Sequence, residues 1–159
     1  MDERDPIKVK HWIGSVGPTD FLVPGEVLAL TEAERMMTSI GFYLSGVIAA
    51  GIIFIGCRFL LAPSTAAVAY GVPASNEPRS RAYLSAKGIR DIASGLFVAM
   101  LMVYGSTRVL GWFMLIATLI PIVDAMIVLR NGGSRTIAFG VHGITAVVML
   151  IISGLLLVD

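Results

Sequence analysis

The chain has 159 residues, of which 56% are hydrophobic and only 14% are charged, and its mean hydropathy is +0.83. Soluble domains of this size rarely have so apolar a composition, so the sequence predicts an integral membrane protein. The formal net charge of +1 argues against nucleic acid as a partner, because nucleic-acid binding needs a basic patch. The single cysteine, Cys57, excludes a disulfide framework within one chain and a cysteine-rich metal site.

Residues 1–35 are expected to form an N-terminal tail at the membrane interface, where the Trp12 ring is suited to the headgroup level. The alternative is a tail without a role. No signal peptide is evident at its start. The tail ends in Thr31-Glu-Ala-Glu34, a capping-box pattern in which Thr31 accepts a hydrogen bond from the Glu34 backbone and the Glu34 side chain reaches back. This pattern predicts that the first long helix begins at Thr31.

Four apolar segments follow, each about long enough for a membrane crossing, which takes roughly 20 helical residues. They cover residues 36–61, 84–104, 109–129 and 136–158. Two of the three connections are short, which favours antiparallel neighbours. The predicted fold class is therefore all-α: an integral membrane four-helix up-down-up-down bundle formed by residues 36–159. Pro121 is expected to kink the third helix, and Gly88 and Gly143 are expected to lie at close helix contacts.

Arginine residues determine the predicted orientation. The first and third connections lie on the same side of such a bundle, and they carry Arg58, Arg79, Arg81, Arg130 and Arg135. The positive-inside rule then places these connections in the cytoplasm and both termini outside. The membrane would be the endoplasmic reticulum in a eukaryote and the inner membrane in a bacterium.

A polar stripe opens the second predicted span. Its members are spaced i, i+4, i+7, i+8 and i+11, which places them on one helix face; they are Tyr83, Lys87, Arg90, Asp91 and Ser94. A charge that faces hydrocarbon costs several kcal/mol, so this face is expected to point into the bundle.

Each predicted span also carries an ionisable side chain at a similar depth. At a rise of about 1.5 Å per residue, these groups lie roughly 7–12 Å from the cytoplasmic end; they are Arg58, Asp91, Asp124 and His142. Matching depth predicts one shared polar chamber. Because the cations outnumber the carboxylates once Lys87 and Arg90 are included, the chamber suits a lipid phosphate, a carboxylate or a developing oxyanion. No metal site and no redox cofactor are expected, because the chain lacks spaced ligand pairs and cofactor motifs.

Several motifs occur in order along the chain. They are Arg58-Phe-Leu-Leu-Ala-Pro63, Tyr70-Gly-Val-Pro73, Tyr83-Leu-Ser-Ala-Lys87-Gly-Ile-Arg90-Asp91, Ile120-Pro-Ile-Val-Asp124, Asn131-Gly-Gly-Ser134 and Val141-His142-Gly143. Together, over roughly residues 38–158, they resemble a family of small four-helix integral membrane proteins of bacteria and fungi, described only as a domain of unknown function. The layout is also similar to DoxX-like membrane proteins. The resemblance implies the four-helix fold but does not indicate any activity.

One hypothesis is a cofactor-independent enzyme, a hydrolase, cyclase or isomerase, that acts on a lipophilic small molecule in a biosynthetic pathway. Asp91 and Asp124 would be acid and base and Arg90 would orient them, since an arginine between two carboxylates can keep one ionised while the other stays protonated. The expected substrate-binding residues are Tyr83, Lys87, His142 and Arg58.

The second hypothesis is a non-catalytic lipid-binding or assembly subunit, whose polar cluster locks the register of the helices. In both hypotheses the lipid bilayer is a partner, and the chain itself is a candidate partner in a homo-oligomer. An open cavity lined by Asp91 and Asp124 favours the enzyme, whereas direct Arg–Asp contacts that fill the space favour the subunit.

Overall fold

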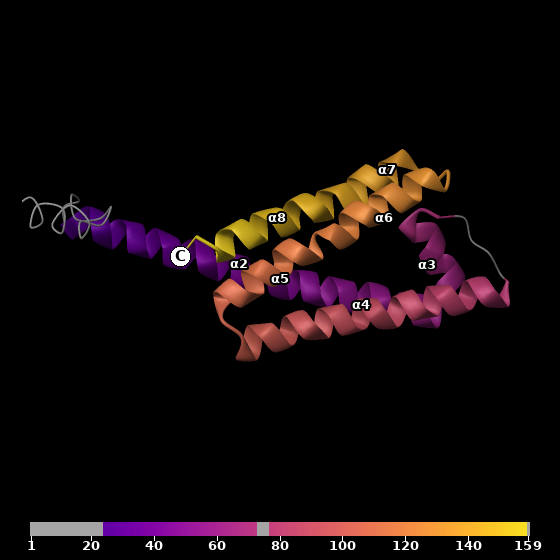
Figure 1. Ribbon diagram of the computed structural model, residues 1–159, viewed down its shortest axis with the longest axis horizontal. Helices are drawn as coiled ribbons and strands as arrows, with labels where there is room; N and C mark the ends of the chain where they lie inside the picture. Colours follow the sequence, from indigo (N-terminus) through magenta and orange to yellow (C-terminus); the bar gives the residue numbers. More distant parts are fainter. Residues whose placement is uncertain (1–23, 73–76, 159) are drawn as a thin grey trace, which may run out of the picture. The chain divides into compact units, whose positions relative to one another are not determined.

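The computed structural model describes residues 24–72 and 77–158. These ranges are helical apart from short connections and contain no strand, which confirms the all-α class (Figure 1). The chain divides into two compact units, Met1–Arg35 and Met36–Asp159. The expected interfacial Trp12 lies outside the described residues.

The first described helix, α2, runs from Pro24 to Leu61, so the prediction that it begins at Thr31 is wrong. Thr31 lies inside the helix, and its hydroxyl donates to the carbonyl oxygens of Val27 at 3.2 Å and Leu28 at 2.9 Å. The helix instead starts at a proline, whose missing N–H is harmless in the first turn, and Glu26 adds a favourable acidic side chain there.

The second unit contains the rest of α2 and all the later helices. They are α3 (Pro63–Tyr70), α4 (Pro78–Tyr104), α5 (Thr107–Ala117), α6 (Leu119–Arg130), α7 (Arg135–Ile137), the π-helix η1 (Ala138–Gly143) and α8 (Ile144–Leu156). Helices α5 and α6 continue one another along a line beside α7, η1 and α8 (Figure 1). In this arrangement α5 packs on α8, and α6 packs on η1.

Three helical segments of the described chain are long and apolar enough to cross a membrane: Gly25–Leu61, Thr107–Arg130 and Arg135–Leu156. These segments indicate a membrane protein. Helix α4 lies outside this set, because the charged residues in its N-terminal half shorten its apolar part.

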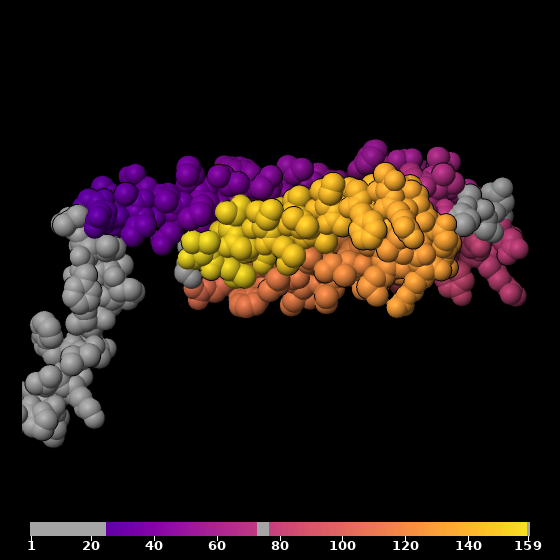
Figure 2. Space-filling view, turned by 90° about the horizontal axis from the view of Figure 1, so that it is seen from above, coloured from indigo at the N-terminus to yellow at the C-terminus, as the bar shows by residue number. Residues whose placement is uncertain are grey.

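The surface of the second unit is also apolar, in keeping with helices that face lipid. Helix α8 and the segment before it form much of the face seen in Figure 2. Ile144, Val147 and Ile151 of α8 are exposed. On other helices Val103 and Ile116 are exposed as well. So many large exposed apolar side chains would be unfavourable in water and are favourable in a bilayer.

Glycines bring α2 and α4 into direct backbone contact. A Cβ atom added to Gly88 would lie 2.7 Å from the Gly56 carbonyl oxygen and 2.9 Å from the Phe59 Cβ, and one added to Gly56 would lie 2.6 Å from the Gly88 carbonyl oxygen. The contact expected at Gly88 is therefore present. The close contact expected at Gly143 is absent, since a Cβ there would have the Ala138 carbonyl oxygen at 3.7 Å, an ordinary van der Waals distance.

Candidate functional site

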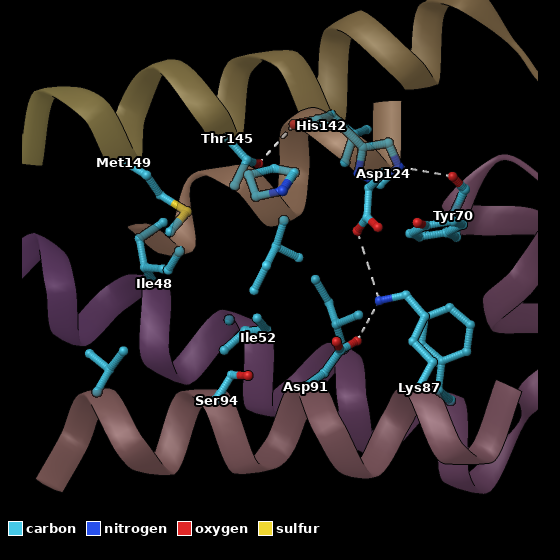
Figure 3. Close-up of a pocket in the computed structure, with 18 of the residues that line it drawn as sticks. Ile48, Ile52, Tyr70, Lys87, Asp91, Ser94, Asp124, His142, Thr145 and Met149 are labelled. Carbon is cyan, nitrogen blue, oxygen red and sulfur yellow. Dashed lines mark hydrogen bonds and ion pairs between the residues drawn. The ribbon is translucent and has the colours of Figure 1, made fainter. Parts of the chain in front are cut away.

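A cavity of about 500 Å³ lies among the helices of the second unit (Figure 3). Its polar and charged lining residues are Arg58, Tyr70, Lys87, Asp91, Ser94, Asp124, His142 and Thr145. The other lining side chains are apolar or aromatic. Lys87, Tyr70 and His142 lie towards one end of the cavity, and Ile48 and Met149 lie towards the other (Figure 3). Such a cavity suits an elongated lipophilic molecule with a polar group at one end.

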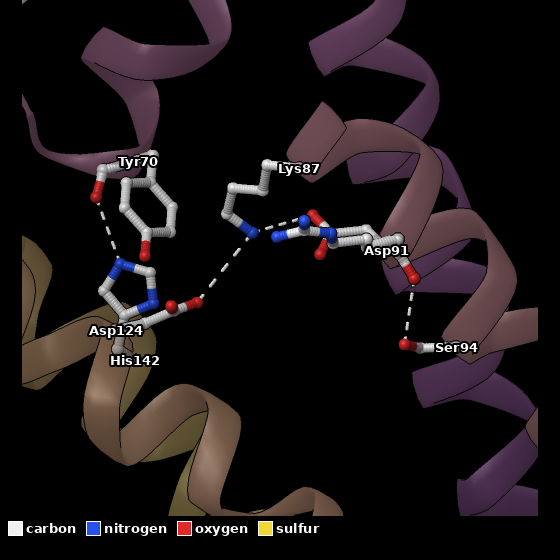
Figure 4. Close-up of polar contacts among 7 residues, drawn as sticks. Tyr70, Lys87, Asp91, Ser94, Asp124 and His142 are labelled. Carbon is white, nitrogen blue, oxygen red and sulfur yellow. Dashed lines mark hydrogen bonds and ion pairs between the residues drawn. The ribbon is translucent and has the colours of Figure 1, made fainter. Parts of the chain in front are cut away.

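The polar end is built around the Lys87 ammonium (Figure 4). Lys87 Nζ donates to Asp91 Oδ2 at 2.8 Å, one helical turn along α4, and lies 3.9 Å from Asp124 Oδ2 on α6. It also lies 5.1 Å from the centre of the Phe59 ring and 4.9 Å from the centre of the Tyr70 ring. Two carboxylates and two aromatic faces thus stabilise one cation.

The structure brings five of the predicted site residues to the cavity, namely Arg58, Lys87, Asp91, Asp124 and His142. Tyr83 is 78% exposed and Arg90 is also exposed, and neither lines the cavity. Lys87, rather than Arg90, lies between the two carboxylates. At about 100° per residue, Arg90 is displaced by about 100° from Asp91 around α4, so it projects from the edge of the stripe.

The expected surplus of positive charge is absent from the immediate cluster. Lys87 contributes one positive charge, whereas Asp91 and Asp124 contribute two negative charges when both are ionised. Arg58 lines the cavity as well, but its side chain is exposed and it belongs to neither of these ion pairs. A bound cationic group is therefore better matched to the cluster than an anion.

His142 enters the site from the π-helix η1, which the sequence analysis did not predict. Short π segments within helices are frequent at functional sites. Its Nε2 lies 3.0 Å from the carbonyl oxygen of Tyr70, and because a carbonyl only accepts, Nε2 carries the hydrogen. The two rings also pack edge to face, with centroids 4.6 Å apart. Nδ1 is therefore the nitrogen that can exchange a proton.

Tyr70 lines the cavity but was not among the predicted site residues, although it opens the Tyr70-Gly-Val-Pro73 motif. It ends α3, and Gly71 follows with φ of 100°, a left-handed conformation that glycine adopts without strain. Burial, followed by a hydrogen bond with Asp124 and the negative charges of Asp124 and Asp91, raises the pKa of the Tyr70 phenol far above its usual value. The phenol therefore stays protonated and acts as a hydrogen-bond donor.

The break between α5 and α6 shapes the wall next to Asp124. Pro121 has no N–H for the Ala117 carbonyl, and the helix is interrupted before it, at Thr118. The Thr118 hydroxyl is buried and donates to the Met114 carbonyl oxygen at 2.9 Å. Both Ala117 and Pro121 line the cavity, and Asp124 follows one turn later.

A family model described as "Domain of unknown function (DUF4267)" matches residues 49–156, more than half of the chain. The chain belongs to this family. The match confirms the resemblance to a family of unknown function, and DUF4267 covers the Lys87 cluster together with His142. No curated protein and no solved structure matched the chain. Any functional conclusion about this DUF4267 member has to come from the chemistry of its cavity.

Proposed function

We propose that this protein is an integral membrane enzyme that performs acid–base chemistry on a lipophilic small molecule. The observation that carries the proposal is the pair of carboxylates, Asp91 and Asp124, that flank the Lys87 ammonium at the polar end of an apolar cavity. Interacting ionisable groups gathered in a cleft are typical of functional sites. Reactions within reach of such groups are epoxide opening by water, cyclisation and double-bond isomerisation, without a cofactor.

The proposal includes an up-down-up-down bundle of four membrane-crossing columns. They are α2 from Met36 onward, α4, the α5–α6 pair, and the segment from α7 to α8. The α4 column can cross because Lys87 and Asp91 face the cavity and neutralise each other, while an exposed Arg90 can extend to the headgroups. The membrane would be the endoplasmic reticulum in a eukaryote and the inner membrane in a bacterium.

Asp124 is the proposed proton-transfer group. Asp91 is engaged with Lys87 at 2.8 Å, whereas Asp124 is 3.9 Å from the ammonium and accepts a hydrogen bond from the Tyr70 hydroxyl. The Tyr70 hydroxyl and Nδ1 of His142 supply a further donor and a proton carrier at the same end of the cavity. The apolar walls limit water, which strengthens the electrostatic interactions of these groups with a substrate.

Comparing the molecules that co-purify with the wild type and with Asp124→Asn tests this function. The amide matches the carboxylate in size but cannot transfer the proton, so the variant should retain a precursor that the wild type converts. Mass spectrometry should show two molecules that are isomers or that differ by one water. Glu32→Gln, an exposed change on α2 in the first unit, is the control and should behave like the wild type.

A non-catalytic lipid-binding subunit is the second candidate. It is favoured by the close Lys87–Asp91 contact, which by itself would stabilise the packing of α4 without any chemistry. For this function the same unaltered lipid should co-purify with the wild type and with Asp124→Asn. That result would refute the enzyme proposal.

A further inference from the structure

We infer that Lys87 forms an imine with a lipophilic aldehyde or ketone bound in the cavity. The inference deepens the proposed function, on whose cavity it rests, and it specifies carbonyl compounds as the substrate class. Lys87 is the only lysine in the described ranges 24–72 and 77–158; the other two lysines, Lys8 and Lys10, precede them. The cavity therefore has a single side-chain primary amine in the part of the chain that the structure describes.

The amine is placed where a bound lipophilic molecule would present its polar end. Lys87 extends from α4 towards Asp124, and the apolar wall continues away from it past Ile52 to Ile48 and Met149 (Figure 3). The Lys87 side chain is 27% exposed and lines the cavity. A volume of about 500 Å³ lies within the usual range for small-molecule sites.

The surroundings of Nζ suit a protonated imine as well as they suit an ammonium. Both species carry one positive charge, so imine formation preserves the ion pairs with Asp91 and Asp124. With both carboxylates ionised the cluster carries a net charge of −1, which stabilises a protonated imine over a neutral one. The Phe59 and Tyr70 rings, at 5.1 and 4.9 Å, stabilise the same charge through cation–π contacts.

The reaction balances with groups that are present at the site. Asp124 accepts a proton from the ammonium, and the free amine attacks the carbonyl carbon; a C–N bond forms while the electron pair of the C=O π bond moves to oxygen. A proton passes from nitrogen to that oxygen, which gives a carbinolamine. Protonated Asp124 then returns its proton to the hydroxyl, the C–O bond breaks, and water leaves as the nitrogen lone pair forms the C=N bond. Nothing is oxidised or reduced.

A protonated imine at this position would also serve the proposed acid–base chemistry. It withdraws electrons from the adjacent carbon, so a proton on that carbon becomes easier to remove. Asp124, again a carboxylate after water has left, is 3.9 Å from Nζ and lies on the same side of the cavity as His142. The substrate class is therefore a carbonyl compound with a long apolar chain, and isomerisation next to the carbonyl is the matching reaction.

Reductive trapping tests the inference. The full chain in detergent is incubated with dodecanal and cyanoborohydride, which converts an imine into a stable secondary amine. Intact mass and peptide mapping should show one dodecyl group at Lys87. The Lys87→Arg variant keeps the positive charge and should lose this adduct, whereas the matched control Lys8→Arg should keep it. Glycolaldehyde, which is small and polar, should show no preference for Lys87 over Lys8 and Lys10.

A dodecyl group found only on Lys8, Lys10 or the N-terminal amine of the wild type would overturn the inference. Peptide mapping of the wild type decides this even where Lys87→Arg fails to fold.

The Asp124→Asn variant should form the adduct about a hundredfold more slowly, in line with general acid–base catalysis. An unchanged rate would refute the role of Asp124 in imine formation. An adduct at Lys87 together with identical co-purified molecules in the wild type and Asp124→Asn would support the imine and refute the proposed enzyme. If no adduct forms at Lys87 but the molecules that co-purify with the wild type and with Asp124→Asn differ, only the imine is refuted.

Discussion

The contact between Gly56 and Gly88 allows a quantitative test of how α4 is held against α2. In Gly88→Ala the new Cβ would lie 2.7 Å from the Gly56 carbonyl oxygen, 2.9 Å from the Phe59 Cβ and 3.2 Å from the Leu60 backbone nitrogen. These atoms belong to the backbone or to a Cβ, so they cannot rotate away. The two helices have to move apart by several tenths of an ångström.

The expected loss of stability follows from two opposing effects. Overpacking of a tight contact costs about 1–3 kcal/mol, and the rigid neighbours of Gly88 favour the upper part of that range. Alanine is favoured over glycine inside a helix by about 1 kcal/mol. The net loss should be about 2 kcal/mol, which corresponds to a decrease of about 4–8 °C in Tm for a chain of this size.

Thermal unfolding in detergent, followed by circular dichroism, measures this loss. The control is Gly154→Ala in α8, where a Cβ has nothing within 4 Å, so Tm should stay the same or rise slightly. The double variant Gly56→Ala with Gly88→Ala should cost less than the sum of the single variants, because one separation of the helices relieves both contacts. Equal Tm values for Gly88→Ala and Gly154→Ala, or fully additive losses, would refute this account of the contact.

Three further predictions address topology, pH and the ion pair. Single cysteines at positions 77 and 132, with the native cysteine replaced, should both react with a membrane-impermeant reagent from the cytoplasmic side; labelling from opposite sides would exclude the four-span topology. The folded pKa of the Tyr70 phenol lies above its unfolded value of about 10, so stability should fall as the pH rises beyond about 10, and Tyr70→Phe should reduce that fall in an alkaline unfolding titration. Asp91→Asn should lower stability by about 1–3 kcal/mol, since Lys87 then keeps only the more distant carboxylate. In a denaturant titration the double change with Lys87→Met should restore part of this loss, and a double variant less stable than Asp91→Asn would contradict the ion-pair assignment.

Local chemistry made the helices predictable from the amino-acid sequence. Pro63 ends the first long helix and the second ends next to Gly105, so the predicted ends at residues 61 and 104 agree with α2 and α4. The start of α2 differs from the prediction because the Thr31-Glu-Ala-Glu34 pattern also fits a helix interior, and the helix begins at Pro24. Capping signals are weak when a longer helix can continue through them.

Part of the candidate site was also predictable, because depth along a helix follows from residue number. Counting from the helix ends placed Asp91, Asp124 and His142 at similar depth, and all three line the cavity. The identity of the cation between the carboxylates was not predictable, because Lys87 and Arg90 belong to the same stripe. The rotation of α4 against α2, set by the glycine contact, turns Lys87 inward and leaves Arg90 exposed.

Tertiary structure alone decided the surroundings of His142. The sequence placed this residue between two glycines in an apolar helix, but the π-helical turn from Ala138 to Gly143 has no local signal in the residue pattern. The partner of His142 is the carbonyl oxygen of Tyr70, 72 residues earlier in the chain, where α3 ends at Gly71. Every residue has a backbone carbonyl, so the sequence does not indicate that Tyr70 supplies the acceptor. Only the contact between α3 and η1 in the folded chain shows which nitrogen of His142 holds its proton.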